Sequence, residues 1–156
     1  MPLNRRQILT SLSLAALLPL VPFAAAAERR GTREEAQAMV EEAIALFKAE
    51  GPEATIAAIN MPHTKFLKSD LYVFLIGPGG RTVAHGFDQS RVGLDVGVLV
   101  DQTGKPYGRE LLTATPQGIW VDYTWRDPLT DTMEPKSTWA KKVDDFIFGC
   151  GVYMPV

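Results

Sequence analysis

The stretch from Gly118 to Lys142 constrains the fold more than any other part of the sequence. From residue 119 to residue 126 every second side chain is apolar or aromatic, which is the period of a β-strand. Asp-Pro and Glu-Pro steps interrupt the pattern between residues 127 and 135, because proline has no backbone N–H for a sheet. We therefore predict a β-hairpin whose second strand begins at Lys136. Its first strand places four side chains on one face: Ile119, Val121, Tyr123 and Trp125.

The first 27 residues have the composition of an export signal. Arg5 and Arg6 precede an uncharged apolar run, and the alanines at 24–27 offer a cleavage site. The order Asn-Arg-Arg-Gln-Ile-Leu resembles a twin-arginine signal, although general secretion also accepts two arginines there. We predict a cleaved signal peptide over residues 1–27. An uncleaved membrane anchor and an ordinary helix are the alternatives, and the apolar run is short for a span of about 20 residues.

Cleavage would leave a single domain over residues 28–156. This mature chain would carry a net charge of −4, because the leader holds two of the 16 basic residues and none of the 18 acidic ones. An acidic balance argues against nucleic acid or an anionic membrane surface as the partner. Cys150 is the only cysteine, so no internal disulfide can form and the core alone must hold the domain.

The residues after the leader predict an amphipathic helix. Thr32 and Glu35 form a capping box at its start, and apolar residues then recur at helical spacing. Gly51 and Pro52 end this helix, and Pro52 suits the first turn of a shorter helix over Glu53–Ile59. The apolar stripe should lie against a sheet: Ala36, Met39, Val40, Ala43, Ile44 and Phe47.

Three further strands are predicted. Residues 70–76 form a continuous apolar run that ends at a glycine-rich turn, so both faces of this strand must be covered. Residues 81–85 return beside it and place His85 at the strand's end. Residues 146–153 form the last strand, whose two glycines would let another backbone or ring approach closely.

A short helix over residues 105–114 is also predicted, with Tyr107, Leu111 and Leu112 facing inward. Residues 61–69 and 87–104 show no strong period and are expected to be loops. This order of elements predicts an α+β fold, in which helices cover one face of an antiparallel sheet and loops cover the other.

The motifs of catalysis and metal binding are missing from the sequence. His63 and His85 lie 22 residues apart, and no zinc-protease, haem-attachment, calcium-loop or serine-elbow motif occurs. A cysteine on an apolar strand is usually a small core residue, which is the role expected for Cys150. We therefore predict no enzymatic activity, no metal and no cofactor.

Six short segments of the sequence, taken in order, resemble those of a known family. They are Tyr72-Val-Phe with Ala84-His85, Val92-Gly93, residues 101–106 with Arg109-Glu-Leu, residues 118–125 with Pro128, residues 134–137, and residues 149–153. Together they resemble a single Cache domain of the second type, a PAS-like extracytoplasmic sensing module. The resemblance spans about residues 70–153, and the capped helix stands where the family has a long N-terminal helix.

This resemblance implies a five-stranded antiparallel sheet with a pocket on one face, commonly for short organic acids. Lys136 or Arg109 would supply the positive charge that a carboxylate needs. Trp139 departs from the tyrosine or phenylalanine expected at its position. Carried over by position, the pocket residues are His85, Arg109, Tyr123, Trp125, Lys136 and Tyr153.

Members of this family usually sit in receptors with transmembrane helices and a signalling domain. We therefore expect a soluble periplasmic ligand-binding protein that passes its signal or ligand to a membrane receptor, kinase or transporter. The alternative is a structural or protein-interaction module whose pocket is filled by its own side chains.

Overall fold

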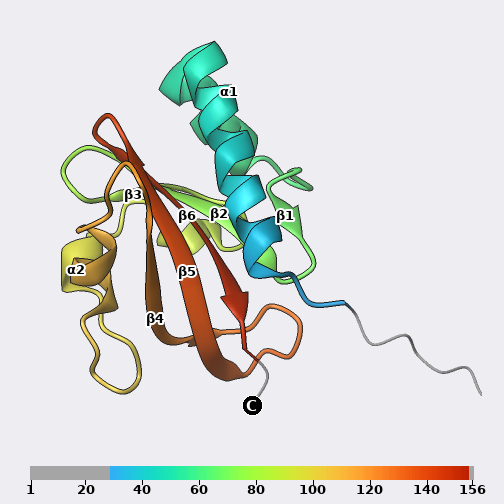
Figure 1. The fold of residues 1–156 in the computed structure, drawn as a ribbon, viewed down its shortest axis with the longest axis vertical. Helices are drawn as coiled ribbons and strands as arrows, with labels where there is room; N and C mark the ends of the chain where they lie inside the picture. Colours follow the sequence, from blue (N-terminus) through green and yellow to red (C-terminus); the bar gives the residue numbers. More distant parts are fainter. Residues whose placement is uncertain (1–28, 155–156) are drawn as a thin grey trace, which may run out of the picture.

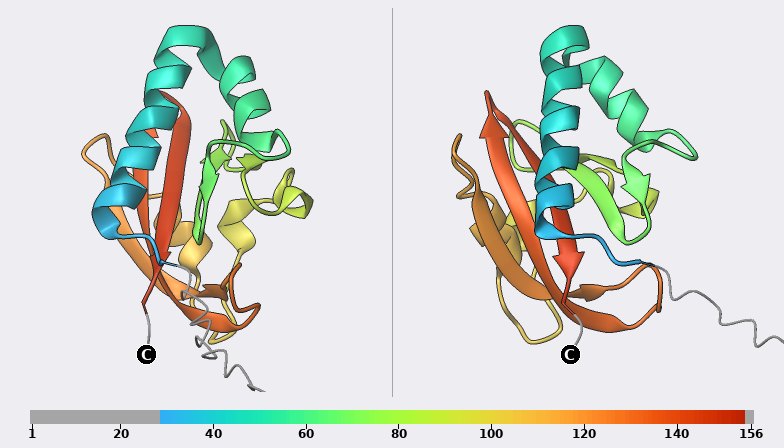
Figure 2. Two further views of the ribbon diagram at one scale, coloured as in Figure 1. Left: turned by 90° about the vertical axis from the view of Figure 1, so that its right-hand side faces the viewer. Right: turned by 45° about the vertical axis from the view of Figure 1, so that its right-hand side comes forward.

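A computed structural model describes residues 29–154 of the chain. One long helix lies across one face of an antiparallel sheet, and irregular segments with a short helix cover the other face (Figures 1 and 2). The predicted α+β class is therefore confirmed. The predicted signal peptide, residues 1–27, lies outside the described residues. No helix among residues 29–154 is long and apolar enough to cross a membrane.

Helix α1 (Arg33–Asn60) joins the two helices that the sequence predicts. Thr32 accepts from the backbone of Glu35, and the Glu35 carboxylate accepts from the backbone of Thr32, so the predicted capping box is present. Gly51 interrupts the helix with a φ of 88°, a left-handed conformation that favours glycine. Figure 2 shows the two arms of the helix meeting at this bend.

The strands form one sheet in the order β1-β2-β6-β5-β4, and β3 pairs with β2. All of the pairs are antiparallel. The five predicted strands correspond to β2 to β6, and β1 is a short addition in the predicted loop. The strand bounds are β1 (Leu67–Lys68), β2 (Leu71–Ile76), β3 (Thr82–His85), β4 (Ile119–Arg126), β5 (Met133–Val143) and β6 (Phe146–Tyr153).

Strand β5 begins at Met133, earlier than the predicted start at Lys136, because Pro135 is accommodated in the strand. The N–H and C=O of one residue point to the same side of an extended strand. The Pro135 carbonyl accepts from the Met154 backbone at 3.0 Å, so the missing N–H faces the end of β6 and not β4. Strand β4 therefore keeps its pairing.

Two 3-10 turns and one short helix cover the second face: η1 (Gln89–Arg91), η2 (Val96–Val98) and α2 (Tyr107–Leu111). The helix is shorter than predicted, and Leu112 just beyond it is 37% exposed, so its predicted inward orientation is wrong. Tyr107 and Leu111 are buried as predicted.

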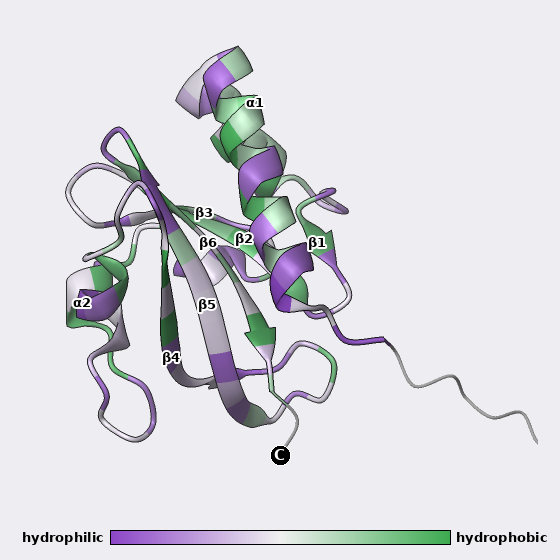
Figure 3. Ribbon diagram, viewed as in Figure 1, coloured by the Kyte–Doolittle hydropathy of each residue, from purple (hydrophilic) through white to green (hydrophobic). Residues whose placement is uncertain are grey.

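The two faces of the sheet bury different side chains. The apolar stripe of α1 packs on Val73, Leu75 and Phe148, and Figure 3 shows how apolar residues of this helix alternate with hydrophilic ones. The predicted face of β4 lies on the opposite side, where Ile119, Val121, Tyr123 and Trp125 belong to one cluster. The alternation in the sequence therefore assigns the faces of β4 correctly.

The two glycines of β6 allow close approach, as predicted. A Cβ at Gly149 would lie 2.2 Å from the ring of Phe74, and one at Gly151 would lie 2.4 Å from Cε of Lys136. Both distances are too short for real atoms. Glycine at these positions therefore lets the Phe74 ring and the Lys136 side chain lie directly on strand β6.

Candidate ligand-binding site

A pocket lies on the sheet face opposite α1. It is bounded by β2, β3 and β4, by residues 91–99 and by α2. Its volume is about 40 Å³, which is roughly room for three water molecules. Its wall is mostly apolar or aromatic, with a few polar side chains, as in many small-molecule sites. The polar residues of the wall, apart from its tyrosines, are Thr82, His85 and Arg91.

Stacked aromatic rings form the wall beside α2. The rings of Tyr107 and Tyr123 stack with centroids 4.3 Å apart, and Trp125 meets Tyr107 at 5.5 Å. The Tyr123 hydroxyl shares a hydrogen bond of 2.9 Å with Thr138, and burial raises the pKa of Tyr123 well above its ordinary value. Burial also raises the pKa of Tyr107 to about 12. Both tyrosines are therefore neutral hydroxyls in the pocket wall.

His85 ends strand β3 and lines the pocket. Its Nδ1 accepts from the backbone N–H of Asp88 at 2.9 Å and of Phe87 at 3.3 Å. Burial, together with the nearby charge of Lys136, lowers the pKa of His85 to about 3. The imidazole is therefore neutral at physiological pH.

Arg91 supplies a positive charge at the edge of the pocket. Its guanidinium lies over the ring of Trp125, 4.7 Å from the ring centroid, and its Nε donates to Asp88 at 3.1 Å. The side chain is 37% exposed. Sequence reasoning missed this residue because it lies in residues 87–104, where no period indicates which side chains face inward.

Lys136 lies behind the pocket wall and is fully buried. Its Nζ donates to the hydroxyls of Tyr72 at 2.6 Å and Tyr153 at 3.2 Å, and it lies 3.9 Å from the ring centroid of Tyr72. Burial lowers the pKa of Lys136 to about 7, although Cys150, Asp70 and Asp127 favour its charged form. Tyr72 itself lines the pocket, so a single side chain separates the ammonium from that space.

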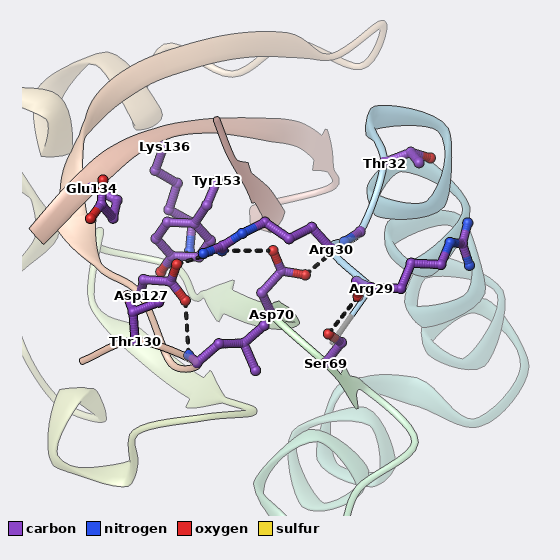
Figure 4. Close-up of polar contacts among 12 residues, drawn as sticks. Arg29, Arg30, Thr32, Ser69, Asp70, Asp127, Thr130, Glu134, Lys136 and Tyr153 are labelled. Carbon is purple, nitrogen blue, oxygen red and sulfur yellow. Dashed lines mark hydrogen bonds and ion pairs between the residues drawn. The ribbon is translucent and has the colours of Figure 1, made fainter. Parts of the chain in front are cut away.

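Arg30 joins two fully buried carboxylates next to this lysine (Figure 4). Its guanidinium pairs with Asp127 at the end of β4 and with Asp70, 3.4 Å away, at the start of β2. Asp70 also accepts from the backbone of Gly31 at 2.7 Å. The contacts tie the segment before α1 to the sheet. Sequence reasoning missed this cluster, since its members lie 40 and 97 residues apart.

The structure brings some of the six predicted site residues together. His85, Tyr123 and Trp125 line the pocket. Lys136 and Tyr153 form the layer behind Tyr72, where the Tyr153 hydroxyl donates to the carbonyl of Arg126 at 2.6 Å.

Arg109, the sixth predicted site residue, lies outside the pocket lining, and so does Trp139, which departs from the family pattern. Arg109 is exposed on α2, and its Nε donates to the Gly97 carbonyl at 3.4 Å, outside the pocket lining. Trp139 lies on the α1 face beside Trp120, with centroids 5.3 Å apart. In the part of the chain that the structure describes, no group of three or more His, Cys, Asp or Glu side chains is arranged to hold a metal ion.

A sheet with a long helix on one face and an aromatic pocket on the other defines the class of PAS-like Cache sensor domains. The chain belongs to the family of single Cache domain 2, because the model of that family matches residues 14–155. The resemblance inferred from residues 70–153 is thus confirmed. The family match also begins inside the predicted signal peptide.

Solved structures share this fold. A methyl-accepting chemotaxis protein from Vibrio parahaemolyticus RIMD 2210633 is 19% identical, with a TM-score of 0.61 over 77% of this chain and 86% of that chain. A periplasmic sensor domain of a chemotaxis protein is 21% identical, with a TM-score of 0.56 over 78% of this chain and 90% of that one. A comparison with curated proteins finds no match.

A third structure comes from a study of carboxylic acid recognition by a Cache chemosensory domain. It is 16% identical, with a TM-score of 0.53 over 78% of this chain and 88% of that chain. At such identities these likenesses show the shared fold, so the PAS-like architecture expected from the sequence is confirmed.

Proposed function

We propose that this domain is an extracytoplasmic sensor that binds a small organic acid in the pocket opposite α1. The position of Arg91 is the observation that carries the proposal. Its guanidinium stacks on Trp125 at the edge of an aromatic pocket, where a carboxylate can bind it through two parallel hydrogen bonds. The carboxylic acid named for one structural neighbour supports this ligand class.

Arg91 has the free donors that such a ligand needs. Its Nε is engaged by Asp88, and its two terminal nitrogens make no hydrogen bond within residues 29–154. Lys136 adds positive charge behind the wall and holds the hydroxyl of Tyr72. We propose that Lys136 and Tyr153 support the anion site from this position, while Tyr107, Tyr123 and Trp125 enclose the apolar body of the ligand.

A second candidate is a protein-interaction module with a self-filled pocket. The small volume of the pocket and the close stacking of Tyr107 on Tyr123 favour it. Sites for drug-sized ligands measure about 300 Å³ or more, so a ligand of more than a few atoms requires the pocket wall to open around it. The two candidates differ in whether any small acid stabilises the folded domain.

A thermal-shift screen against small carboxylates separates the candidates. A ligand that binds only the folded state stabilises it by about 2.7 kcal/mol at a concentration of 100 times Kd. We expect Arg91→Ala to weaken binding of the best acid by roughly 1.5–3 kcal/mol, the range for hydrogen bonds to charged groups. Its exposed pair with Asp88 contributes little, about 0–1 kcal/mol, to the free energy of unfolding.

Arg109→Ala is the matched control, because Arg109 is an exposed cation on the neighbouring helix and outside the lining. It should leave acid affinity unchanged. Equal affinity of the wild type and Arg91→Ala would refute the assignment of Arg91. The absence of a shift with any acid would favour the interaction module.

We also propose that the domain acts in the periplasm and passes its signal or ligand to a membrane receptor, kinase or transporter. The export signal predicted over residues 1–27 and the extracytoplasmic members of the family support this location. The mass of the protein recovered from the periplasm tests it, because cleavage after Ala27 removes all of that segment.

A further inference from the structure

The proton of the His85 imidazole has a fixed position. Nδ1 accepts two backbone hydrogen bonds, from Asp88 at 2.9 Å and from Phe87 at 3.3 Å. A nitrogen that accepts such bonds carries no proton, so the proton of the neutral ring is on Nε2. Nε2 is therefore a donor and never an acceptor.

The surroundings of His85 hold the ring in this orientation. It lies against Tyr72, with centroids 4.9 Å apart, and against Phe74 at 6.1 Å. Its backbone N–H donates to Asn60 at 3.0 Å, and its carbonyl accepts from Gln89 at 2.7 Å. With the residue only 7% exposed, the ring has little freedom to turn.

The Nε2–H group lacks a partner and borders open space. Within residues 29–154, the one fully enclosed polar side-chain atom without a hydrogen bond is Nε1 of Trp139. Nε2 of His85 has no hydrogen bond either and is not fully enclosed, so water can reach part of its surface. Because Nδ1 faces the turn at residues 87–88, Nε2 lies on the other side of the ring, and the pocket is the space that His85 lines.

The hydroxyls of the pocket wall do not have this restriction. The hydroxyls of Tyr107 and Thr82 make no hydrogen bonds within the described chain, and a hydroxyl can either donate or accept. The charged groups around His85 are Lys136 on β5, Asp88 just before η1 and Arg91 on η1. Burial is the largest cause that lowers the pKa of His85, Lys136 and Arg91 act in the same direction, and only Asp88 opposes them. The imidazole therefore stays neutral over the physiological range.

We propose that His85 is a specificity-determining residue whose fixed Nε2–H recognises a neutral acceptor oxygen of the ligand. The pocket then prefers an acid that carries a hydroxyl or carbonyl oxygen besides its carboxylate to an unsubstituted acid of equal length. This inference rests on the proposed function in placing the ligand in this pocket. In this proposal Arg91 binds the carboxylate of the ligand, and His85 donates a hydrogen bond to the additional oxygen.

Four probe compounds separate the two contributions: propionate, lactate, propionamide and lactamide. Within each pair the hydroxyl is the only difference, and between the pairs the charge differs. We expect calorimetry on the wild type to show lactate bound about tenfold tighter than propionate, the size of one neutral hydrogen bond. Lactamide should show a similar preference over propionamide.

His85→Asn is the sharpest variant, because its amide oxygen can accept from the turn in place of Nδ1, while its own N–H groups lie closer to the backbone than Nε2 and leave that donor position empty. The hydroxyl preference should fall to about one, with propionate affinity unchanged. Arg109→Ala is the control, since Arg109 lies outside the pocket lining, and it should keep the preference. An unchanged preference in His85→Asn overturns the inference, and so does equal binding of both acids by the wild type.

The four compounds distinguish a failure of the inference about His85 from a failure of the proposed function. If the acids bind no tighter than their amides, acid sensing fails, and the amide pair still tests His85. If none of the four compounds binds, both ideas fail. NMR of the wild-type imidazole gives a readout that needs no variant: the neutral Nε2–H tautomer is expected from about pH 5 to about pH 8. A proton on Nδ1 in that range overturns the inference.

Discussion

The two faces of the sheet are formed by the same strands but bury different kinds of side chain. Strand β6 gives Phe148, Cys150 and Val152 to the α1 side, where all three are buried among apolar residues. Its alternate residues give the other face two glycines and the hydroxyl of Tyr153. The first face is closed mainly by apolar packing, with a hydrogen bond of 3.1 Å from Arg33 of α1 to the buried hydroxyl of Ser137. The second keeps polar groups buried at a cost in stability, which is typical of a functional site.

Lys136 shows this cost most clearly. It is fully buried, it has no ion pair among the described residues, and its pKa of about 7 lies well below the ordinary 10.5. A buried charge that is replaced by an apolar side chain of similar volume often leaves a protein equally or more stable. We therefore propose that this lysine has a role in binding.

Lys136→Met gives the largest expected effect. We expect the variant to be more stable than the wild type by about 1–4 kcal/mol at about pH 6, and to bind acids more weakly by roughly 1.5–3 kcal/mol. The hydroxyls of Tyr72 and Tyr153 lie 3.3 Å apart and can still bond to each other. Denaturant unfolding measures the stability, and calorimetry measures the affinity.

The stability difference should depend on pH. Between the folded pKa of about 7 and the ordinary value of 10.5, Lys136 binds fewer protons in the folded state than in the unfolded state. The stability of the wild type therefore rises with pH in this window, and the advantage of the variant shrinks from about pH 7 to about pH 9. A constant difference over this range would show that Lys136 keeps its proton in the folded domain.

Cys150→Ala tests the α1 face with a smaller effect of opposite sign. Cys150 is fully buried, and burial raises the pKa of its thiol to about 12, so the group is neutral and unreactive. The truncation should lower the free energy of unfolding by about 1–2 kcal/mol and leave ligand affinity intact. Loss of affinity in a folded variant would instead assign a functional role to the thiol.

Periodic parts of this structure were predictable, and contacts between loops were not. The alternation in β4 placed Tyr123 and Trp125 on one face, because a strand has a period of two. Arg91 and the pair of Arg30 with Asp127 belong to segments without a period, so only the folded chain shows their positions. The location of Lys136 also depends on Gly151, which lets the side chain lie on β6, behind Tyr72 rather than in the open pocket.

The three tryptophans test the central claim most directly, because they divide between the faces. Trp125 lines the pocket, whereas Trp120 and Trp139 pack on the α1 side. The indole N–H signals can be followed by NMR while the best acid from the thermal screen is added. We predict that the Trp125 signal shifts in a saturable way and that the other two stay in place. Saturable shifts of Trp120 and Trp139 with an unmoved Trp125 would contradict the assignment of the binding face.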